Sequence, residues 1–142
     1  MRIRRLGPED VEAALGNCRL FWDMESAGGN LAAFLADPDC ILLAAEVDGR
    51  PVGQIVGHVL KRWDARRPRL LLHSIDVVES HRRRGAARRL IRAFHRIGEA
   101  AGCGSSTVFT EESDAPATGL YRAVGGSRAD TGGALFEWRW SP

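Results

Sequence analysis

The chain has 142 residues, of which 44% are hydrophobic and 27% are charged, a composition typical of a soluble globular protein. The formal net charge of +2 is too small to indicate a nucleic-acid partner, and no apolar run is long enough to span a membrane. Three cysteines without metal-ligand spacing, and a first segment without the apolar core of a signal peptide, predict a cytoplasmic protein with no bound metal. The length predicts a single domain over residues 1–142.

The first part of the chain has the pattern of one strand followed by two helices. Alternation predicts a strand over 2–6, and Pro8 with two acidic residues behind it predicts the start of a helix that runs to about Trp22. Asn30 is a typical N-cap for a second helix over 31–36.

The middle of the chain predicts three strands and a long helix. Apolar strands over 40–47 and 52–60 flank a typical hairpin turn at residues 48–49. A polar loop over 61–69 leads to a third strand over 70–78. After Gly85 the apolar residues change to helical spacing, which predicts a helix that ends at Gly102.

The last part of the chain predicts a strand over 104–110, a short helix over 115–123 and a final strand over 135–140. Phe136, Trp138 and Trp140 lie on one face of this final strand. Such a row of aromatic residues is either part of the core or a surface shared with a second subunit, so a homodimer stays open. The order of elements predicts a mixed α/β sheet.

The junction between the third strand and the long helix has the features of a phosphate site. It carries three consecutive arginines, Arg82, Arg83 and Arg84, followed by Gly85. A helix start exposes unpaired N–H groups and the positive end of the helix dipole, and glycine lets a ligand approach the backbone. The chain has neither a P-loop nor a G-x-G-x-x-G motif. The alternative interpretation is a solvated basic face or a nucleic-acid patch.

The spacing Arg82-x-x-Gly85-x-Ala87, followed by Leu120-Tyr121-x-x-x-Gly125, resembles the acetyl-coenzyme A site of the GNAT family of N-acetyltransferases. The resemblance covers nearly the whole chain. It implies an α/β (α+β) GNAT fold, with a central mixed and mostly antiparallel sheet that is splayed at the acetyl-coenzyme A site and flanked by helices. Within the family, the chain most resembles the aminoglycoside 3-N-acetyltransferase type.

The resemblance also implies which residues bind acetyl-coenzyme A. Backbone groups of the third strand pair with the pantetheine arm, the N–H of Val77 polarises the thioester carbonyl, and the basic turn binds the pyrophosphate. The implied set is Ile75, Asp76, Val77, Arg82, Arg83, Arg84, Gly85, Ala86, Ala87, Asp114, Ala117 and Tyr121.

Tyr121 and one acidic residue are the candidates for catalysis. Tyr121, the only tyrosine of the chain, is expected to be the general acid that protonates the departing sulfur. The base that removes a proton from the amine is either Asp76, Glu111, Glu112, His73 or water. The 3-N type commonly has an acidic residue where this chain has Ser74, whereas Glu111 falls where that subfamily has an acidic residue.

These features predict an acetyl-coenzyme A-dependent N-acetyltransferase that acts on a primary amine of a small polar substrate by direct attack on the thioester. An aminoglycoside antibiotic is one candidate substrate. Two alternatives stay open, a protein or peptide N-acetyltransferase and a non-catalytic acyl-coenzyme A binding module.

Overall fold

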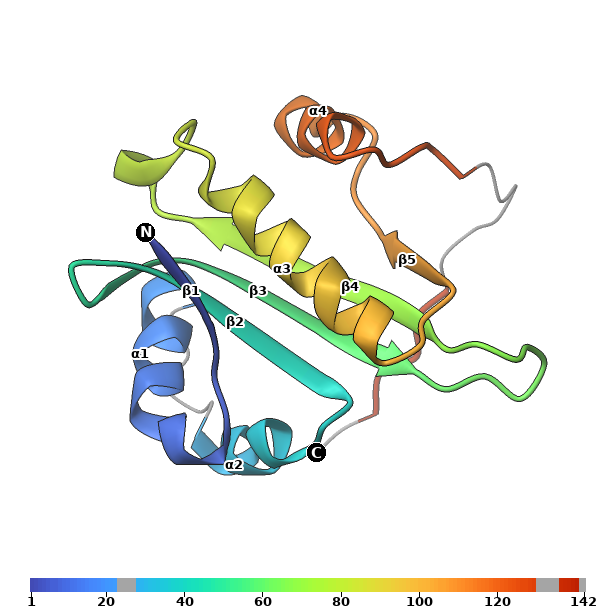
Figure 1. Cartoon of the computed structure of the whole chain (residues 1–142), viewed down its shortest axis with the longest axis horizontal. Helices are drawn as coiled ribbons and strands as arrows, with labels where there is room; N and C mark the ends of the chain where they lie inside the picture. The colour runs from blue at the N-terminus through green and yellow to red at the C-terminus, as the bar shows by residue number, and fades with distance from the viewer. Residues whose placement is uncertain (23–27, 130–135, 141–142) are drawn as a thin grey trace.

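A five-stranded sheet with the order β1-β2-β3-β4-β5 forms the centre of the structure (Figure 1). The computed structural model describes residues 1–22, 28–129 and 136–140. The strands are β1 (Arg2–Arg5), β2 (Cys40–Val47), β3 (Arg50–Leu60), β4 (Arg69–Val77) and β5 (Ser105–Val108). The helices are α1 (Val11–Trp22), α2 (Gly28–Ala36), α3 (Ala86–Ala100) and α4 (Ala115–Ala123), with short 3₁₀ turns η1 (Pro8–Asp10) and η2 (Glu79–His81).

The strand pairing confirms the predicted fold class. All neighbouring strands are antiparallel except β4 and β5, which are parallel, so the sheet is mixed and mostly antiparallel. β2, β3 and β4 follow one another without a helix between them, whereas α1 and α2 lie between β1 and β2, and β4 and β5 are joined through α3. A parallel pair requires such a crossover connection.

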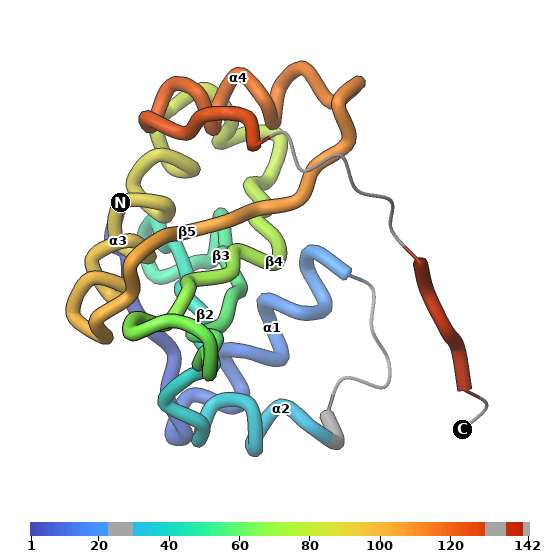
Figure 2. Tube along the Cα trace, turned by 90° about the vertical axis from the view of Figure 1, so that its right-hand side faces the viewer, coloured from blue at the N-terminus to red at the C-terminus, as the bar shows by residue number. Residues whose placement is uncertain are grey.

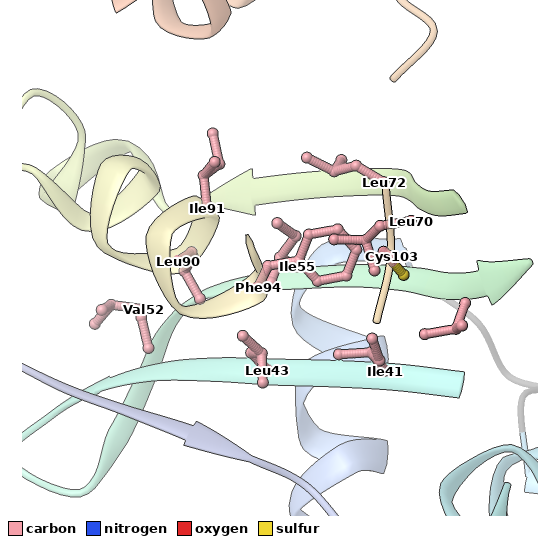
Figure 3. Close-up of a cluster of buried hydrophobic side chains, with 12 residues drawn as sticks. Ile41, Leu43, Val52, Ile55, Leu70, Leu72, Leu90, Ile91, Phe94 and Cys103 are labelled. Carbon is pink, nitrogen blue, oxygen red and sulfur yellow. The ribbon is translucent and has the colours of Figure 1, made fainter. Parts of the chain in front are cut away.

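The helices cover both faces of the sheet. Figure 2 shows α3 on one side and α1 with α2 on the other. On the α3 side, Leu90 and Phe94 pack against Leu43 and Ile55 in a buried apolar cluster (Figure 3). A second cluster lies between the opposite face of the sheet and the helices α1 and α2. None of the described helices combines the length and apolar character that crossing a membrane requires.

Gly57 allows α3 to lie close to the sheet. A Cβ atom at this position would fall well inside van der Waals contact with the Leu71 carbonyl oxygen and the Phe94 ring. Phe94 is fully buried and belongs to the core cluster of Figure 3. The absence of a side chain at Gly57 therefore fixes the position of α3 over β3.

The predicted final strand over 135–140 is wrong for its described part. Residues 136–140 form no strand, and they lie apart from the rest of the described chain (Figure 2), while residue 135 and the connection at 130–133 lie outside the described residues. A strand requires a partner for its backbone groups, and β4 is the only described strand that pairs with β5. Phe136, Trp138 and Trp140 are 75%, 71% and 83% exposed, so they are not core residues of the single chain. A surface shared with a second subunit stays a prediction.

We expect Gly57→Ala to destabilise the fold by about 3 kcal/mol, because overpacking at a helix–sheet contact forces the backbone or Phe94 to move. Gly16→Ala, in α1, is the matched control, since its added Cβ meets no atom within 4 Å. That control should stabilise the protein by about 0.5–1 kcal/mol, because alanine is the better helix former. Urea unfolding measures both changes, and a Gly57→Ala variant as stable as the parent would contradict the packing argument.

Candidate active site

The site begins where β4 and β5 stop pairing. The parallel ladder joins residues 69–72 to residues 105–108, with Leu72 and Val108 as the last pair. β4 continues to Val77, so its second half has no neighbour on the β5 side within the described residues. The sheet is therefore splayed at this point, as the family resemblance implies.

The unpaired edge of β4 presents two sets of backbone groups. Val78 N–H donates to the Val52 carbonyl at 2.9 Å, which makes Val52 and Val78 a hydrogen-bonded pair. Because bonded and non-bonded pairs alternate along an antiparallel ladder, Ile75 and Val77 direct their N–H and C=O groups away from β3. These are the groups that a ligand between β4 and β5 would meet.

A β-bulge sets the direction of the side chains along this half of β4. Gly57 pairs with Leu72 and the next residue back, Val56, pairs with Ser74, so His73 is the extra residue. One inserted residue reverses the faces of all that follow. Ser74 and Asp76 consequently share the face of the sheet that α1 covers.

A cleft of about 840 Å³ opens at the splay. Eight of the predicted site residues line it, namely Ile75, Asp76, Val77, Arg82, Ala87, Asp114, Ala117 and Tyr121. Five predicted residues are not among its lining residues, namely Arg83, Arg84, Gly85, Ala86 and Glu111. The cleft wall also includes Leu20 and Phe21 at the end of α1.

The turn before α3 has the conformation of an anion-binding loop. Gly85 is the N-cap of α3 at φ +84°, and Arg83 is also left-handed at φ +62°. Left-handed residues beside a helix start gather backbone N–H groups into a concave site for anions. Arg82 Nε donates to the Val77 carbonyl at 3.1 Å, which attaches this turn to the unpaired end of β4.

α4 is fixed at both ends by its own residues. The Asp114 carboxylate accepts from Ala117 N–H at 3.1 Å and caps the first turn. At the other end, Gly126 N–H donates to the Tyr121 carbonyl at 2.9 Å, and Gly125 is left-handed at φ +93°. This is the Schellman arrangement, and it explains why the helix ends in a glycine pair.

Tyr121 is half-buried on α4 and packs against the core cluster on the α3 side. Burial, and then the charges of Asp114 and Asp76, raise the pKa of the Tyr121 phenol above its ordinary value. All three causes disfavour the phenolate, so the phenol keeps its proton at neutral and moderately alkaline pH. This is the protonation state that a general acid needs.

Asp76 has a buried partner that sequence reasoning missed. Gln54 on β3 lies directly opposite Asp76, is 0% exposed, and donates from Nε2 to Asp76 Oδ2 at 3.3 Å. Its amide oxygen is buried without a partner among the described residues, which costs about 1–3 kcal/mol. A glutamine in the middle of an apolar strand was the available signal. Its partner depends on the register between β3 and β4.

The other candidate bases have different surroundings. Glu111 lies on the exposed loop after β5, and Glu112 forms an ion pair with Arg128 at 2.5 Å. His73, the bulge residue, is exposed and has its ring 6.4 Å from that of His58. Of the acidic candidates, Asp76 is the one that lines the cleft.

A family model for the acetyltransferase (GNAT) family matches residues 9–125 of the chain. The chain therefore belongs to the GNAT family, and it is a GNAT-family acetyltransferase. Members of this family use acetyl-coenzyme A. No curated protein matches the chain.

The fold is also that of solved aminoglycoside acetyltransferases. One, from an uncultured soil metagenomic sample in complex with sisomicin, has 19% identity and a TM-score of 0.87, covering 99% of this chain and 96% of that chain. A second soil metagenomic enzyme has 24% identity and a TM-score of 0.85, covering 99% and 98%. AAC(6')-Iy with a bisubstrate analog has 22% identity and a TM-score of 0.81, covering 99% and 97%. At these identities the likeness establishes the fold alone, and a specific relation to the 3-N type stays a prediction.

Because Tyr121 is the only tyrosine, its ionisation can be followed directly by the absorbance of tyrosinate. We expect the phenol to titrate above the ordinary tyrosine pKa of about 10. Asp114→Asn, which keeps a capping side chain and removes the charge, should lower the pKa of Tyr121. Glu99→Gln on α3 is the control and should leave it unchanged. A Tyr121 pKa at or below the ordinary value would contradict the description of the site.

Proposed function

We propose that this protein transfers the acetyl group of acetyl-coenzyme A to a primary amine of a small polar acceptor, for which an aminoglycoside is the first candidate. The observation that carries the proposal is the shared cleft: one wall is the unpaired half of β4, another is the start of α3, and a third is α4 with Tyr121. The unpaired backbone edge suits the pantetheine arm of acetyl-coenzyme A, and the anion-binding turn suits its pyrophosphate. The protonated phenol suits the sulfur that leaves.

Different residues of the chain bind different parts of the coenzyme. The turn over residues 82–87 accommodates the pyrophosphate through N–H groups and arginines, and the backbone of Ile75 pairs with the amides of the pantetheine arm. The N–H of Val77 is aimed at the thioester oxygen, where negative charge develops during attack. Acetyl-coenzyme A supplies the activated acetyl thioester to this arrangement.

Tyr121 and Asp76 take the two proton-handling roles in this proposal. Tyr121 donates a hydrogen bond or its proton to the sulfur as it leaves, since its raised pKa keeps the phenol neutral. Asp76 accepts a proton from the acceptor ammonium or holds it by charge, directly or through water. Glu111 stays a second candidate for this role, from the loop beside the cleft residue Thr110.

The charges at the cleft favour a cationic acceptor. Asp76, Glu79 and Asp114 line it on the acidic side, against Arg82 alone among the basic residues. Such an excess of carboxylates attracts polyamines and aminoglycosides, which carry several ammonium groups. A peptide amine is the alternative acceptor, and a non-catalytic coenzyme-binding module is the alternative without turnover.

Thiol release from acetyl-coenzyme A over a panel of aminoglycosides, polyamines, amino acids and short peptides tests the proposal. We expect selective turnover of a polycationic small amine, with the acetylated nitrogen identified by mass spectrometry and NMR. Turnover of peptides alone would replace the acceptor class. Tight coenzyme binding without turnover of any amine would favour the binding module.

Tyr121→Phe should lower kcat by about 100-fold or more, the usual contribution of a general acid, and change the affinity for acetyl-coenzyme A by about twofold at most. In the parent enzyme kcat should fall as the pH rises through the raised pKa of Tyr121, because the acid is then lost. That alkaline limb should be missing in the variant. An unchanged rate would remove Tyr121 from the mechanism.

Gly85→Glu should weaken acetyl-coenzyme A binding by about 100-fold or more, because a side chain strains this left-handed turn and its carboxylate repels the negatively charged pyrophosphate. Gly85→Ala is the matched control, as it keeps the strain without the charge and should give an intermediate loss. Calorimetry measures both affinities. Parent-like affinity in a folded Gly85→Glu variant would contradict the placement of the pyrophosphate.

A further inference from the structure

Gln54 occupies a position with the surroundings of an apolar residue. It is 0% exposed and lies opposite Ala44 of β2 and Asp76 of β4. Ala44 and Val56, the latter two residues along β3 on the same face, belong to the apolar cluster beneath α1 and α2. A leucine or methionine would fit such a position without a polar atom to satisfy.

The polar atoms of Gln54 have one partner in the part of the chain that the structure describes. Nε2 donates to Asp76 Oδ2 at 3.3 Å, and Oε1 is buried without a hydrogen bond. A carboxylate can only accept, so the amide has to turn its nitrogen toward Asp76 and leave its oxygen in the apolar layer. The amide of Gln54 therefore gives no packing advantage over a leucine or methionine at this position. The contact that Gln54 provides is the one to Asp76.

The chemistry of this contact suits a carboxylate that has to bind a cation. A neutral amide restrains Asp76 Oδ2 without cancelling its negative charge, whereas an arginine or lysine in the same place would compete with an incoming ammonium. With Oδ2 hydrogen-bonded to Gln54, Oδ1 is left to meet a group in the cleft, which Asp76 lines and Gln54 does not. Restraining the carboxylate in advance lowers the ordering cost when a ligand binds.

We propose that Gln54 is a positioning residue that acts through Asp76, holding its carboxylate toward the ammonium group of the acceptor amine. The inference rests on the proposed transfer to an amine. It assigns the Gln54–Asp76 pair to acceptor binding and leaves coenzyme binding to the unpaired edge of β4 and the turn before α3.

A double-mutant cycle tests this inference. Gln54→Met keeps the length of the side chain and removes its hydrogen bonds. We expect it to lower kcat/KM for a cationic amine by about tenfold, in the range measured for coupled neighbours, with KM for acetyl-coenzyme A changed by about twofold at most. In an Asp76→Ala background, the same substitution should change kcat/KM by less than about twofold, because the group that it positions is gone.

Thermal unfolding separates positioning from a purely structural effect. Gln54→Met, and Gln54→Leu as a second variant, should melt at or above the parent temperature, since each removes a buried unpaired oxygen. Val56→Ala, on the same strand and face, is the matched control and should melt lower while keeping the parent kcat/KM for the amine. Equal losses in the parent and Asp76→Ala backgrounds, or no loss in either Gln54 variant, would overturn the inference.

Calorimetric binding of the amine to the coenzyme A complex distinguishes this inference from the proposed function. Amine affinity that falls about tenfold in Gln54→Met supports the positioning role even if the parent shows no turnover, which would overturn the proposed transfer alone. Amine affinity that is the same in parent and variant, together with normal turnover, would overturn the role of Gln54 alone. A parent that binds no amine would overturn both.

Discussion

The early end of the ladder between β4 and β5 is the constraint on which the site depends. Four residue pairs join these strands, after which β4 continues to Val77 paired with β3 alone. Backbone N–H and C=O groups need partners, and a strand inside a sheet normally finds them on both sides. Here the outward groups of Ile75 and the N–H of Val77 are left to a ligand or water, since the Val77 carbonyl accepts from Arg82, and the start of α3 and the side of α4 border the same opening.

The packing beneath the cleft keeps its parts in register. α3 lies against the sheet because Gly57 has no side chain where Phe94 crosses it, and Gly98 allows the same close approach to Leu70. The start of α3, with its unpaired N–H groups, is thereby fixed relative to β4. Arg82 adds a direct link through the Val77 carbonyl. The backbone groups that border the cleft depend on such packing, because changing rotamers cannot reposition them.

Local signals in the sequence were sufficient for most of the fold, whereas the coenzyme-binding residues stay a prediction that rests on the family resemblance. Helix spacing and a glycine at each end predicted α3, and the range 115–123 predicted for α4 agrees with the structure. The prediction of a final strand was wrong for its described part. Alternation of Phe136, Trp138 and Trp140 indicates a segment with different residues on its two faces, but it does not indicate whether a neighbouring strand exists. Two further features could not be predicted in this way, because they depend on which residues of neighbouring strands lie opposite each other.

The bulge at His73 and the contact between Gln54 and Asp76 are the two features that local sequence signals could not predict. Each depends on which residue of β3 lies opposite which residue of β4, and a shift of one position would reverse the faces. The same register explains how β4 contributes both backbone groups and a side chain to the cleft. Its backbone groups face the opening where β5 has diverged, while the Asp76 side chain lies on the face that α1 covers.

Amide hydrogen exchange followed by NMR, with and without acetyl-coenzyme A, tests the central claim that the unpaired half of β4 is the binding edge. We expect the coenzyme to slow exchange at the N–H groups of Ile75 and Val77 and to leave Leu70 and Leu72, which lie within the ladder, unchanged. Slowed exchange at sites elsewhere, with Ile75 and Val77 unaffected by bound coenzyme, would contradict it.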